Sequence, residues 1–275
     1  MTRMAGMLVM LLVGARPTLA QGVVVAPHAV FMDHRARSGS VLLYNPNTEP
    51  AEVTISLFYG YPVTDSTGGI VLRTVEAPDS TEPSAAAWLQ AFPRRLTVAP
   101  LERQTIRLLA RPPAGLKDGE YWARLVIAAK GGRIPVTGVT DTAIQIGLTL
   151  EVRTIIGVNY RKGPVQTGVR LSGVRAVPAG DTVHVWTHLE RVGNAAFIGT
   201  ISGVLVDSTG AQRGEFSSPL GVYRTLDPRF AIPVNPLPRG RYRLRVAVAS
   251  QREDLAPEVL LQAPTVRDSI EVRVP

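Results

Sequence analysis

Alternating apolar and polar residues recur along nearly the whole 275-residue chain, in short runs that turn signals separate about every ten positions. An alternation of period two places one face of a segment against a core and the other against solvent, which is typical of β-strands. The 25 glycines and 22 prolines follow no collagen-like period, so they are expected in turns. The pattern predicts an all-β protein, and the length suits two antiparallel β-sandwiches in tandem.

The start of the chain has a different character. Arg3 precedes an apolar run at positions 4–13, Pro17 follows that run, and Thr18-Leu19-Ala20 offers small residues at the two positions that a signal peptidase reads. The run is shorter than the roughly 20 apolar residues that span a bilayer. We therefore expect residues 1–20 to be a cleaved signal peptide, with a buried N-terminal helix as the alternative. The mature chain is then exported to the periplasm or, alternatively, to the cell surface.

The remaining pattern divides into two series of strands. We expect a first domain at 21–156 and a second at 162–275, because Gly157 and Gly163 interrupt the alternation between them. The alanine-rich stretch at 85–90 is the one segment expected to be helical. The strands expected in the first domain lie at 23–31, 41–44, 53–59, 70–72, 96–98, 105–108, 121–127 and 144–152. Those expected in the second lie at 169–171, 183–189, 198–206, 222–226, 229–234, 242–249 and 269–274.

One short pattern occurs twice. The segments 116–126 and 237–247 share Leu, Gly, Tyr and Arg at identical spacing, each after a proline-rich approach and before a strand. A tyrosine at the start of such a strand is similar to the tyrosine corner that pins a loop in immunoglobulin-like sandwiches. We expect Tyr121 and Tyr242 to be structural corners of this kind, in two immunoglobulin-like domains. Chance convergence on a common hairpin is the alternative.

Residue types that common enzyme chemistry needs are scarce. Cysteine is absent, which excludes disulfides, thiolate catalysis and cysteine-ligated metals, and only four histidines are present. His184 and His188 belong to an expected strand, where residues four apart are about 13 Å from each other, too far to share one zinc ion. No nucleophile-elbow or phosphate-loop spacing occurs. We therefore predict a non-enzymatic protein without a cofactor or a metal.

The chain is basic, with 30 Lys and Arg against 22 Asp and Glu. Arg241, Arg243 and Arg245 alternate with apolar residues, so their guanidinium groups are expected on one face of a strand. A solvated outer face is the simplest interpretation. The alternative is a basic strip for anionic partners such as phosphate groups or lipid headgroups. Nucleic acid is not expected, because the chain is exported and this face lacks interleaved aromatic residues.

The most regular alternation lies in the segment 144–153. Its five apolar residues share one face, and the opposite face is polar or small; they are Ile144, Ile146, Leu148, Leu150 and Val152. Such a strand ordinarily fills the core of its own domain. At the edge of a sheet it can instead complete the sheet of a partner, through its unpaired backbone donors and acceptors.

Several segments of the first half occur in the order typical of one protein family. They are Pro27-His-Ala-Val-Phe31, Val41-Leu-Leu-Tyr-Asn45, Phe92-Pro93-Arg-Arg-Leu96-Thr-Val98-Ala-Pro100, Gln104-Thr-Ile106-Arg107-Leu108 and Tyr160-Arg161. Together with the alternating strand, they resemble the N-terminal domain of the periplasmic pilus (fimbrial) chaperones of the PapD type. The second half shows a sandwich pattern without a motif of that family. The resemblance implies two immunoglobulin-like domains at an angle to each other.

The resemblance also implies a mechanism. A donor strand with Ile144, Ile146, Leu148 and, less closely matched, Leu150 at its donor positions would lend apolar side chains to an incomplete pilin-like subunit. Backbone pairing would supply the affinity, and the alternating side chains would fill a groove of the subunit. An outer-membrane usher is a further implied partner.

The family holds the terminal carboxylate of the subunit with an Arg in the first strand and a Lys at the end of the donor strand. The first of these positions corresponds to His28 here. Counting forward from Ile144 places the second at Arg153, whereas counting back from Tyr160 places it at Gly157. Arg153 and His28 are therefore the candidate anchors, and Arg153 is favoured because a guanidinium forks well onto a carboxylate.

The expected function is that of a non-enzymatic periplasmic chaperone, which binds pilus or other exported subunits by donating a β-strand. Two alternatives remain open. One is a structural or adhesive surface component built from the same two domains. The other is a carbohydrate- or lipid-binding module that uses the face of Arg241, Arg243 and Arg245.

Overall fold

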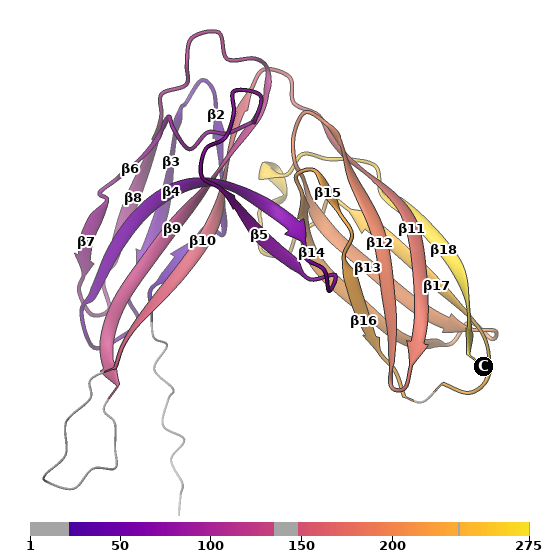
Figure 1. The fold of residues 1–275 in the computed structure, drawn as a ribbon. Coiled ribbons are helices and arrows are strands. Elements are labelled where there is room, and N and C mark those ends of the chain that lie inside the picture. The colour runs from indigo at the N-terminus through magenta and orange to yellow at the C-terminus, as the bar shows by residue number, and fades with distance from the viewer. Residues whose placement is uncertain (1–21, 135–147, 236, 275) are drawn as a thin grey trace, which may run out of the picture.

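The computed structural model describes residues 22–134, 148–235 and 237–274, so the predicted signal peptide lies outside the described part. The regular elements are β-strands, apart from a single-turn helix at Pro257–Val259. Two sandwiches lean together at one end, where the chain passes from the first to the second (Figure 1). The protein is thus all-β with two sandwiches in tandem, as predicted. No helix in the described residues is long and apolar enough to cross a membrane.

The first sandwich contains ten strands. They are β1 (Val24–Ala26), β2 (Ala29–Asp33), β3 (Ser38–Tyr44), β4 (Ala51–Thr64), β5 (Ile70–Val75), β6 (Leu89–Phe92), β7 (Arg95–Val98), β8 (Arg103–Ala110), β9 (Gly119–Ile134) and β10 (Leu148–Lys162). One sheet has the order β1-β3-β8-β6, and the other has the order β2-β10-β9-β4-β5, with β7 also paired to β4. Side chains from both sheets share one core.

One strand pair of this sandwich departs from the predicted antiparallel arrangement. β2 and β10 run parallel, whereas the other strand pairs described in this sandwich are antiparallel. The cause is a change of sheet at Pro27, after which the chain lies alongside the last strand of the domain.

The alternation of the sequence sets the two faces of each strand. In β3, Val41 and Leu43 are buried in the core, and Leu42 between them is exposed. In β8, Ile106 and Leu108 are buried in the same way. Each apolar side chain of this size contributes roughly 1.5–3 kcal/mol when it is fully buried. Packing of this kind stabilises a chain that has no cysteine for disulfides.

The second sandwich contains eight strands. They are β11 (Thr167–Ala179), β12 (Thr182–Gly193), β13 (Phe197–Asp207), β14 (Gln212–Val222), β15 (Thr225–Leu226), β16 (Arg229–Pro233), β17 (Gly240–Ala249) and β18 (Val266–Val274). One sheet joins β11, β12, β15 and β16, and the other has the order β14-β13-β17-β18. Their facing side chains form a second core. The single strand expected at 222–226 does not form, because the chain bends at 223–224 between the end of β14 and the start of β15. β14 itself was not expected, because its glycine and serine residues obscure the alternation.

The segment 85–90 is not a helix. The backbone N–H of Leu89 donates to the carbonyl of Ala85 at 3.1 Å, which closes a single turn. The chain then enters β6, where Leu89 and Ala91 are buried and the backbone pairs with β8. So short a run cannot offset the entropy of nucleating a helix, whereas pairing with an existing strand satisfies its backbone groups.

β10 continues through Gly157 to Lys162 without a break. Gly157 pairs with Arg124 of β9 and with Ala29 of β2, so the domain end predicted at residue 156 falls inside a strand. A glycine does not interrupt a strand where a neighbouring side chain needs the space. The connection to the second sandwich is the segment 163–166 instead.

The repeated tyrosines make the same contact in the two sandwiches. The hydroxyl of Tyr121 donates to the carbonyl of Lys117 at 3.0 Å. The hydroxyl of Tyr242 donates to the carbonyl of Pro238 at 2.8 Å. Each bond reaches four residues back along the chain and pins the loop before a strand, which is the contact that a tyrosine corner makes.

Candidate functional site

One edge of β10 is only partly covered. Along one side, β10 pairs with β9 from Leu148 to Lys162. Along the other side, β2 pairs with it only at 157–161. Among the described residues, no strand pairs with that side of β10 over 148–156. The backbone N–H and C=O groups that point there are therefore available to another strand. We call the segment 148–156 the uncovered edge.

On the face of the uncovered edge that carries Ile156, side chains become more exposed toward the start of β10, whereas Ile155 on the opposite face is 45% exposed. Ile156 is buried, Val152 is half-buried and Leu150 is 38% exposed. The register between β9 and β10 shifts between Thr149 and Glu151, next to Leu150. Such a shift leaves a residue without a partner and bends the strand. An exposed apolar side chain thus lies at the uncovered edge.

The predicted donor positions fall partly beyond the described residues. Ile144 and Ile146 belong to 135–147 and lie outside the described part. Leu148 is the first residue of β10, and Leu150 follows two positions later. The described part of the predicted donor strand is therefore the beginning of the uncovered edge.

The two candidate carboxylate anchors lie apart. His28 is exposed between β1 and β2, and its Nδ1 is 3.8 Å from Oδ2 of Asp254 in the second sandwich. Arg153 lies on β10, where its Nε is 2.5 Å from Oε1 of Glu151. β2 begins beside Gly157, four residues beyond Arg153, which is about 13 Å along the strand. Each candidate anchor already faces a carboxylate of its own chain.

The side chain of a neighbouring strand occupies the space above Gly157. Nη1 of Arg124, on β9, is 2.9 Å from the point where a β-carbon at position 157 would stand. Arg124 is buried, donates from Nε to the carbonyl of Gly60 at 2.9 Å, and lies over the ring of Tyr223 at 4.5 Å. A side chain at 157 would displace this guanidinium. The space above Gly157 is therefore filled by the buried guanidinium of Arg124 from β9.

Sequence reasoning missed Arg124 as part of this region. The one signal in the sequence was that Arg124 and Arg245 occupy the same position of the repeated pattern. That repeat indicated a shared hairpin, but it did not indicate that Arg124 lies beside β10. Its aromatic partner Tyr223 lies 99 positions later in the chain. A contact between residues so far apart in the chain produces no periodic pattern from which it could be predicted.

A buried carboxylate connects the two sandwiches. Glu120 accepts hydrogen bonds from Nε1 of Trp122 at 2.9 Å, from the backbone N–H of Ala196 at 3.0 Å and from Nε of Arg161 at 2.8 Å. Arg161 also donates to the carbonyl of Val259 in the second sandwich at 2.8 Å. Because both charged groups are hydrogen-bonded, this pair avoids the penalty of an uncompensated buried charge.

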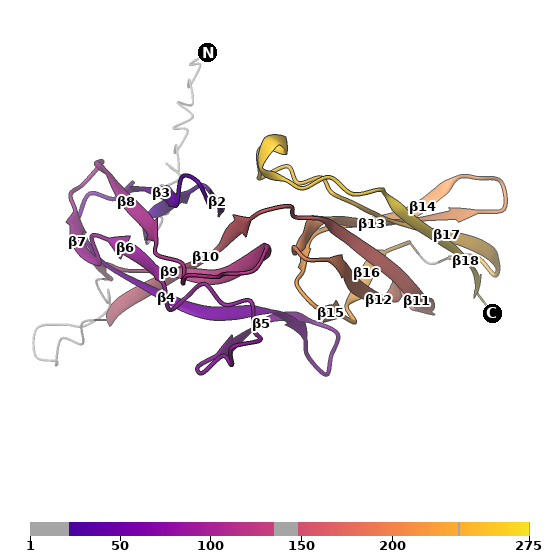
Figure 2. The same cartoon turned by 90° about the horizontal axis from the view of Figure 1, so that it is seen from above.

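The hairpin of β4 and β5 makes a second connection. It extends from the first sandwich toward the second (Figures 1 and 2), and the carbonyl of Gly68 in its turn accepts from the N–H of Arg229 at 2.8 Å. Oγ1 of Thr64 accepts from the N–H of Asp227 at 2.8 Å. These contacts give the uncovered edge a defined position relative to the second sandwich.

Aromatic side chains fill the space between the connections. Tyr59, Tyr61, Trp122 and Tyr223 are buried in one cluster. The rings of Trp122 and Tyr223 meet edge to face with their centres 4.8 Å apart. The hydroxyl of Tyr59 donates to Oε2 of Glu82 at 2.7 Å. Burial raises the pKa of Tyr59 well above its usual value, so this hydroxyl remains a donor.

The histidines of the second sandwich have separate partners. His188 lies beside Asp227, with Nδ1 2.7 Å from Oδ1, and His184 packs edge to face against Trp186. Within the described ranges, no three His, Asp or Glu side chains are grouped so that they could hold a metal ion. The uncovered edge is the feature of the described residues that coincides with the strand predicted to be a donor.

No protein-family model matches this chain, and no curated protein matches its sequence. Solved structures do resemble it. The YadV chaperone, 16% identical, aligns with 91% of this chain and 100% of its own, with a TM-score of 0.45. The CsuC-CsuE chaperone-tip adhesion subunit complex of Acinetobacter baumannii, 12% identical, aligns with 90% of this chain and 97% of its own, with a TM-score of 0.47.

A third structure is the SafB chaperone in complex with the SafA pilin of Salmonella enterica. It is 12% identical and aligns with 91% of this chain and 97% of its own, with a TM-score of 0.43. Each of these three structures contains a chaperone, and two of them also contain a pilin or a tip adhesion subunit.

Proposed function

We propose that this chain is a periplasmic chaperone-like protein, which binds pilus or other exported subunits by strand complementation at the uncovered edge of β10. The observation that carries the proposal is the partial cover of this strand. β2 pairs with β10 at 157–161, and among the described residues nothing pairs with the same side over 148–156. The motifs that resemble PapD-type chaperones lie in the same domain, and a signal peptide at 1–20 would deliver the mature chain to the periplasm.

In this mechanism, an extended segment of the subunit adds to the sheet alongside β10. The uncovered edge spans about 30 Å at roughly 3.3 Å per residue, which exceeds the length of a typical strand. Backbone hydrogen bonds would supply the affinity. The apolar side chains of Leu148 and Leu150, with Ile144 and Ile146 before them, would enter a groove of the subunit. Connections between the sandwiches hold this edge in place, which limits the entropy lost on binding.

The terminal carboxylate of a subunit requires a cation close to this edge. We expect Arg153 to supply it, because 68% of its side chain is exposed and a guanidinium can bind a carboxylate through two parallel hydrogen bonds. Arg153 now pairs with Glu151 on the surface. A surface ion pair contributes little stability, so Arg153 can exchange Glu151 for the carboxylate of a subunit at little cost in free energy. His28 suits the role less well, because Asp254 already places a negative charge beside it.

The Leu150→Asp variant tests the edge. A charge at this position must be desolvated when a strand packs over it, so capture of a pilin-like subunit co-expressed in the periplasm should fall at least about tenfold. Co-purification of the subunit with the tagged chain measures the capture. Leu109→Asp is the matched control, because Leu109 of β8 is 39% exposed, close to the 38% of Leu150. Equal capture by Leu150→Asp and the unmodified chain, both folded by circular dichroism, would contradict the proposal.

Location separates this function from that of a structural or adhesive surface component. A chaperone should be released with the periplasmic contents when the outer membrane is opened. A surface component should stay with the fibres that shearing removes from the cells. Recovery of the chain in the sheared fibres would favour the alternative, whatever the outcome at Leu150.

A further inference from the structure

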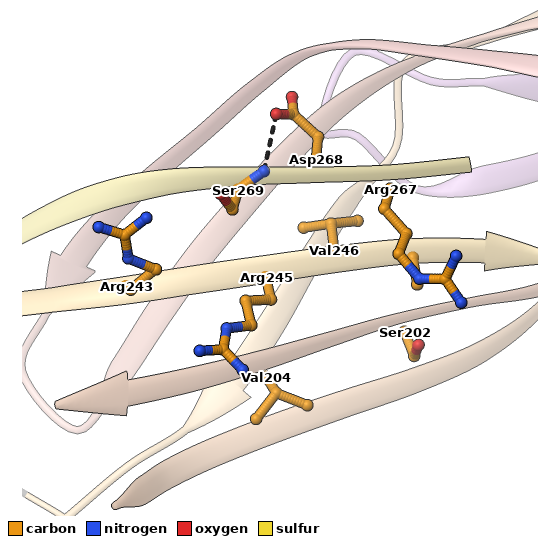
Figure 3. Close-up of a pocket in the computed structure, with 9 residues that line it drawn as sticks. Ser202, Val204, Arg243, Arg245, Val246, Arg267, Asp268 and Ser269 are labelled. Atoms are coloured by element: carbon orange, nitrogen blue, oxygen red, sulfur yellow. Dashed lines mark hydrogen bonds between the residues drawn. The ribbon is translucent and has the colours of Figure 1, made fainter. Parts of the chain in front are cut away.

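The outer face of the sheet β14-β13-β17-β18 carries a cluster of arginines that the proposed function does not use. Arg243 and Arg245 of β17 and Arg267 of β18 are exposed, and they line an open hollow of about 880 Å³ (Figure 3). Ser202 and Ser269 also line it, and their short side chains leave the space between the arginines open. We call these three arginines the arginine face.

Among the described residues, no carboxylate lies within ion-pair distance of the arginine face. None of its three members takes part in an ion pair there. Glu271 of β18 is the cross-strand partner of Arg243, but its carboxylate is shared by Arg241 and Arg273, at 4.0 and 2.9 Å. Asp268 also lines the hollow, but its Oδ1 accepts from the backbone N–H of Ser269 at 2.7 Å, and its carboxylate points away from the arginines (Figure 3). The hollow is therefore cationic.

The arrangement of the three guanidinium groups indicates what they can bind. Arg243 and Arg245 are two residues apart on one strand, about 7 Å, whereas Arg267 comes from the neighbouring strand, where it pairs with Ala247. Their side chains point in different directions and do not converge on one point (Figure 3). One small anion would need convergent donors, whereas separated cations match several anionic groups on one surface.

We infer that the arginine face binds the phosphate-bearing headgroups of an anionic lipid surface. Guanidinium groups bind phosphate oxygens well, and the exposed face of a sheet can lie against a membrane without a change of fold. Each arginine that meets such a surface strengthens binding about fivefold. This function is independent of subunit capture, because the arginine face and the uncovered edge belong to different sandwiches.

Vesicle co-sedimentation tests the inference. The exported, processed chain is mixed with vesicles of phosphatidylglycerol and phosphatidylcholine, or of phosphatidylcholine alone. Binding is expected to the anionic vesicles only, and to weaken with salt as the screening length falls from about 10 Å at 0.1 M to about 3 Å at 1 M. The triple variant Arg243→Gln, Arg245→Gln, Arg267→Gln should lower the partition coefficient by about a hundredfold.

A second triple variant controls for net charge. Arg73→Gln, Arg95→Gln and Arg107→Gln remove the same charge from exposed positions on three strands of the first sandwich. This control should lower the partition coefficient less than about fivefold. Circular dichroism checks that both variants remain folded.

Three results would overturn the inference. One is equal binding to the two kinds of vesicle, and another is an equal loss of binding in the two triple variants. The third is binding of inorganic phosphate or polyglutamate by the arginine face without binding to vesicles. That result would assign the face to a soluble phosphate or to an acidic protein segment instead.

Discussion

At the scale of single residues, the connection between the sandwiches depends on a carboxylate that solvent does not reach. The side chain of Glu120 is 0% exposed, and that of Arg161 is 17% exposed. Glu120→Gln keeps an acceptor for Trp122 but removes the charge that compensates Arg161. Breaking a buried ion pair from one side destabilises a protein by about 3–5 kcal/mol. Because an acceptor remains, we expect a loss of about 2–4 kcal/mol in the free energy of unfolding, measured by urea denaturation.

Glu271→Gln is the matched control for this variant. Glu271 also pairs with arginines, but it lies on the surface, where solvent screens the pair. Its replacement should leave the free energy of unfolding nearly unchanged. If Glu120→Gln lowers the free energy of unfolding no more than Glu271→Gln does, the carbonyl of Val259 alone is sufficient to compensate the buried charge of Arg161.

The same residues mark the limit of what the sequence predicts. Tyr121 and Tyr242 could be assigned as corners because each bonds to a carbonyl only four residues away. Glu120 bonds to Ala196, 76 positions later, and Arg161 to Val259, 98 positions later. Alternation identifies the apolar residues of a core, but it carries no information about which charged residues meet between domains.

At the scale of elements, two hairpins use the same four residues, Asp-Ser-Thr-Gly, at 65–68 and 207–210. Oδ1 of Asp65 accepts from the N–H of Thr67 at 2.8 Å and from its hydroxyl at 2.7 Å. Oδ1 of Asp207 accepts from Thr209 in the same way, at 2.9 and 2.6 Å. The threonine hydroxyl lowers the pKa of each aspartate, and that of Asp207 lies well below its usual range. Both loops thus have the same local structure.

Because their local structure is the same, these two loops allow a controlled test of the connection that the β4–β5 hairpin makes to the second sandwich. Gly68 and Gly210 have φ values of +86° and +87°, where a side chain costs roughly 1–2 kcal/mol. A β-carbon at Gly210 would meet nothing within 4 Å, whereas one at Gly68 would lie 2.5 Å from Cβ of Arg229. We expect Gly210→Ala to lower the free energy of unfolding by about 1 kcal/mol and Gly68→Ala by about 1–3 kcal/mol more. Equal losses in urea denaturation would mean that the hairpin does not hold the second sandwich.

Strands were easier to predict than the way in which they pair. Alternation identified β3, β8 and β17 because each has one buried face. It could not show that β2 covers only the end of β10, since the order of strands in a sheet is set by the fold of the whole domain. Alternation could not show that β10 continues through Gly157, because the guanidinium that requires a glycine there comes from another strand.

At the scale of the whole molecule, one tyrosine of the second sandwich contacts three residues of the first. The hydroxyl of Tyr223 donates to Oδ1 of Asn159 at 3.3 Å. Its ring lies under the guanidinium of Arg124 and meets Trp122 edge to face. Tyr223 belongs to the aromatic cluster between the sandwiches and to neither of the two cores. Its removal should therefore act on the relation between the sandwiches and leave each core folded.

We expect Tyr223→Ala to loosen this relation, because Arg124 loses the ring that covers its buried charge. The radius of gyration from small-angle X-ray scattering should increase, and calorimetry should resolve two unfolding transitions. Tyr44→Ala is the control, since Tyr44 lies 5.3 Å from the guanidinium of Arg103 within the first sandwich. An unchanged radius and a single transition in Tyr223→Ala would mean that Glu120 and the β4–β5 hairpin are sufficient to hold the two sandwiches together.

The same variant also tests where subunits bind. If the sandwiches loosen and the variant still captures subunits, binding is restricted to the uncovered edge. If capture is lost, the second sandwich is part of the binding site.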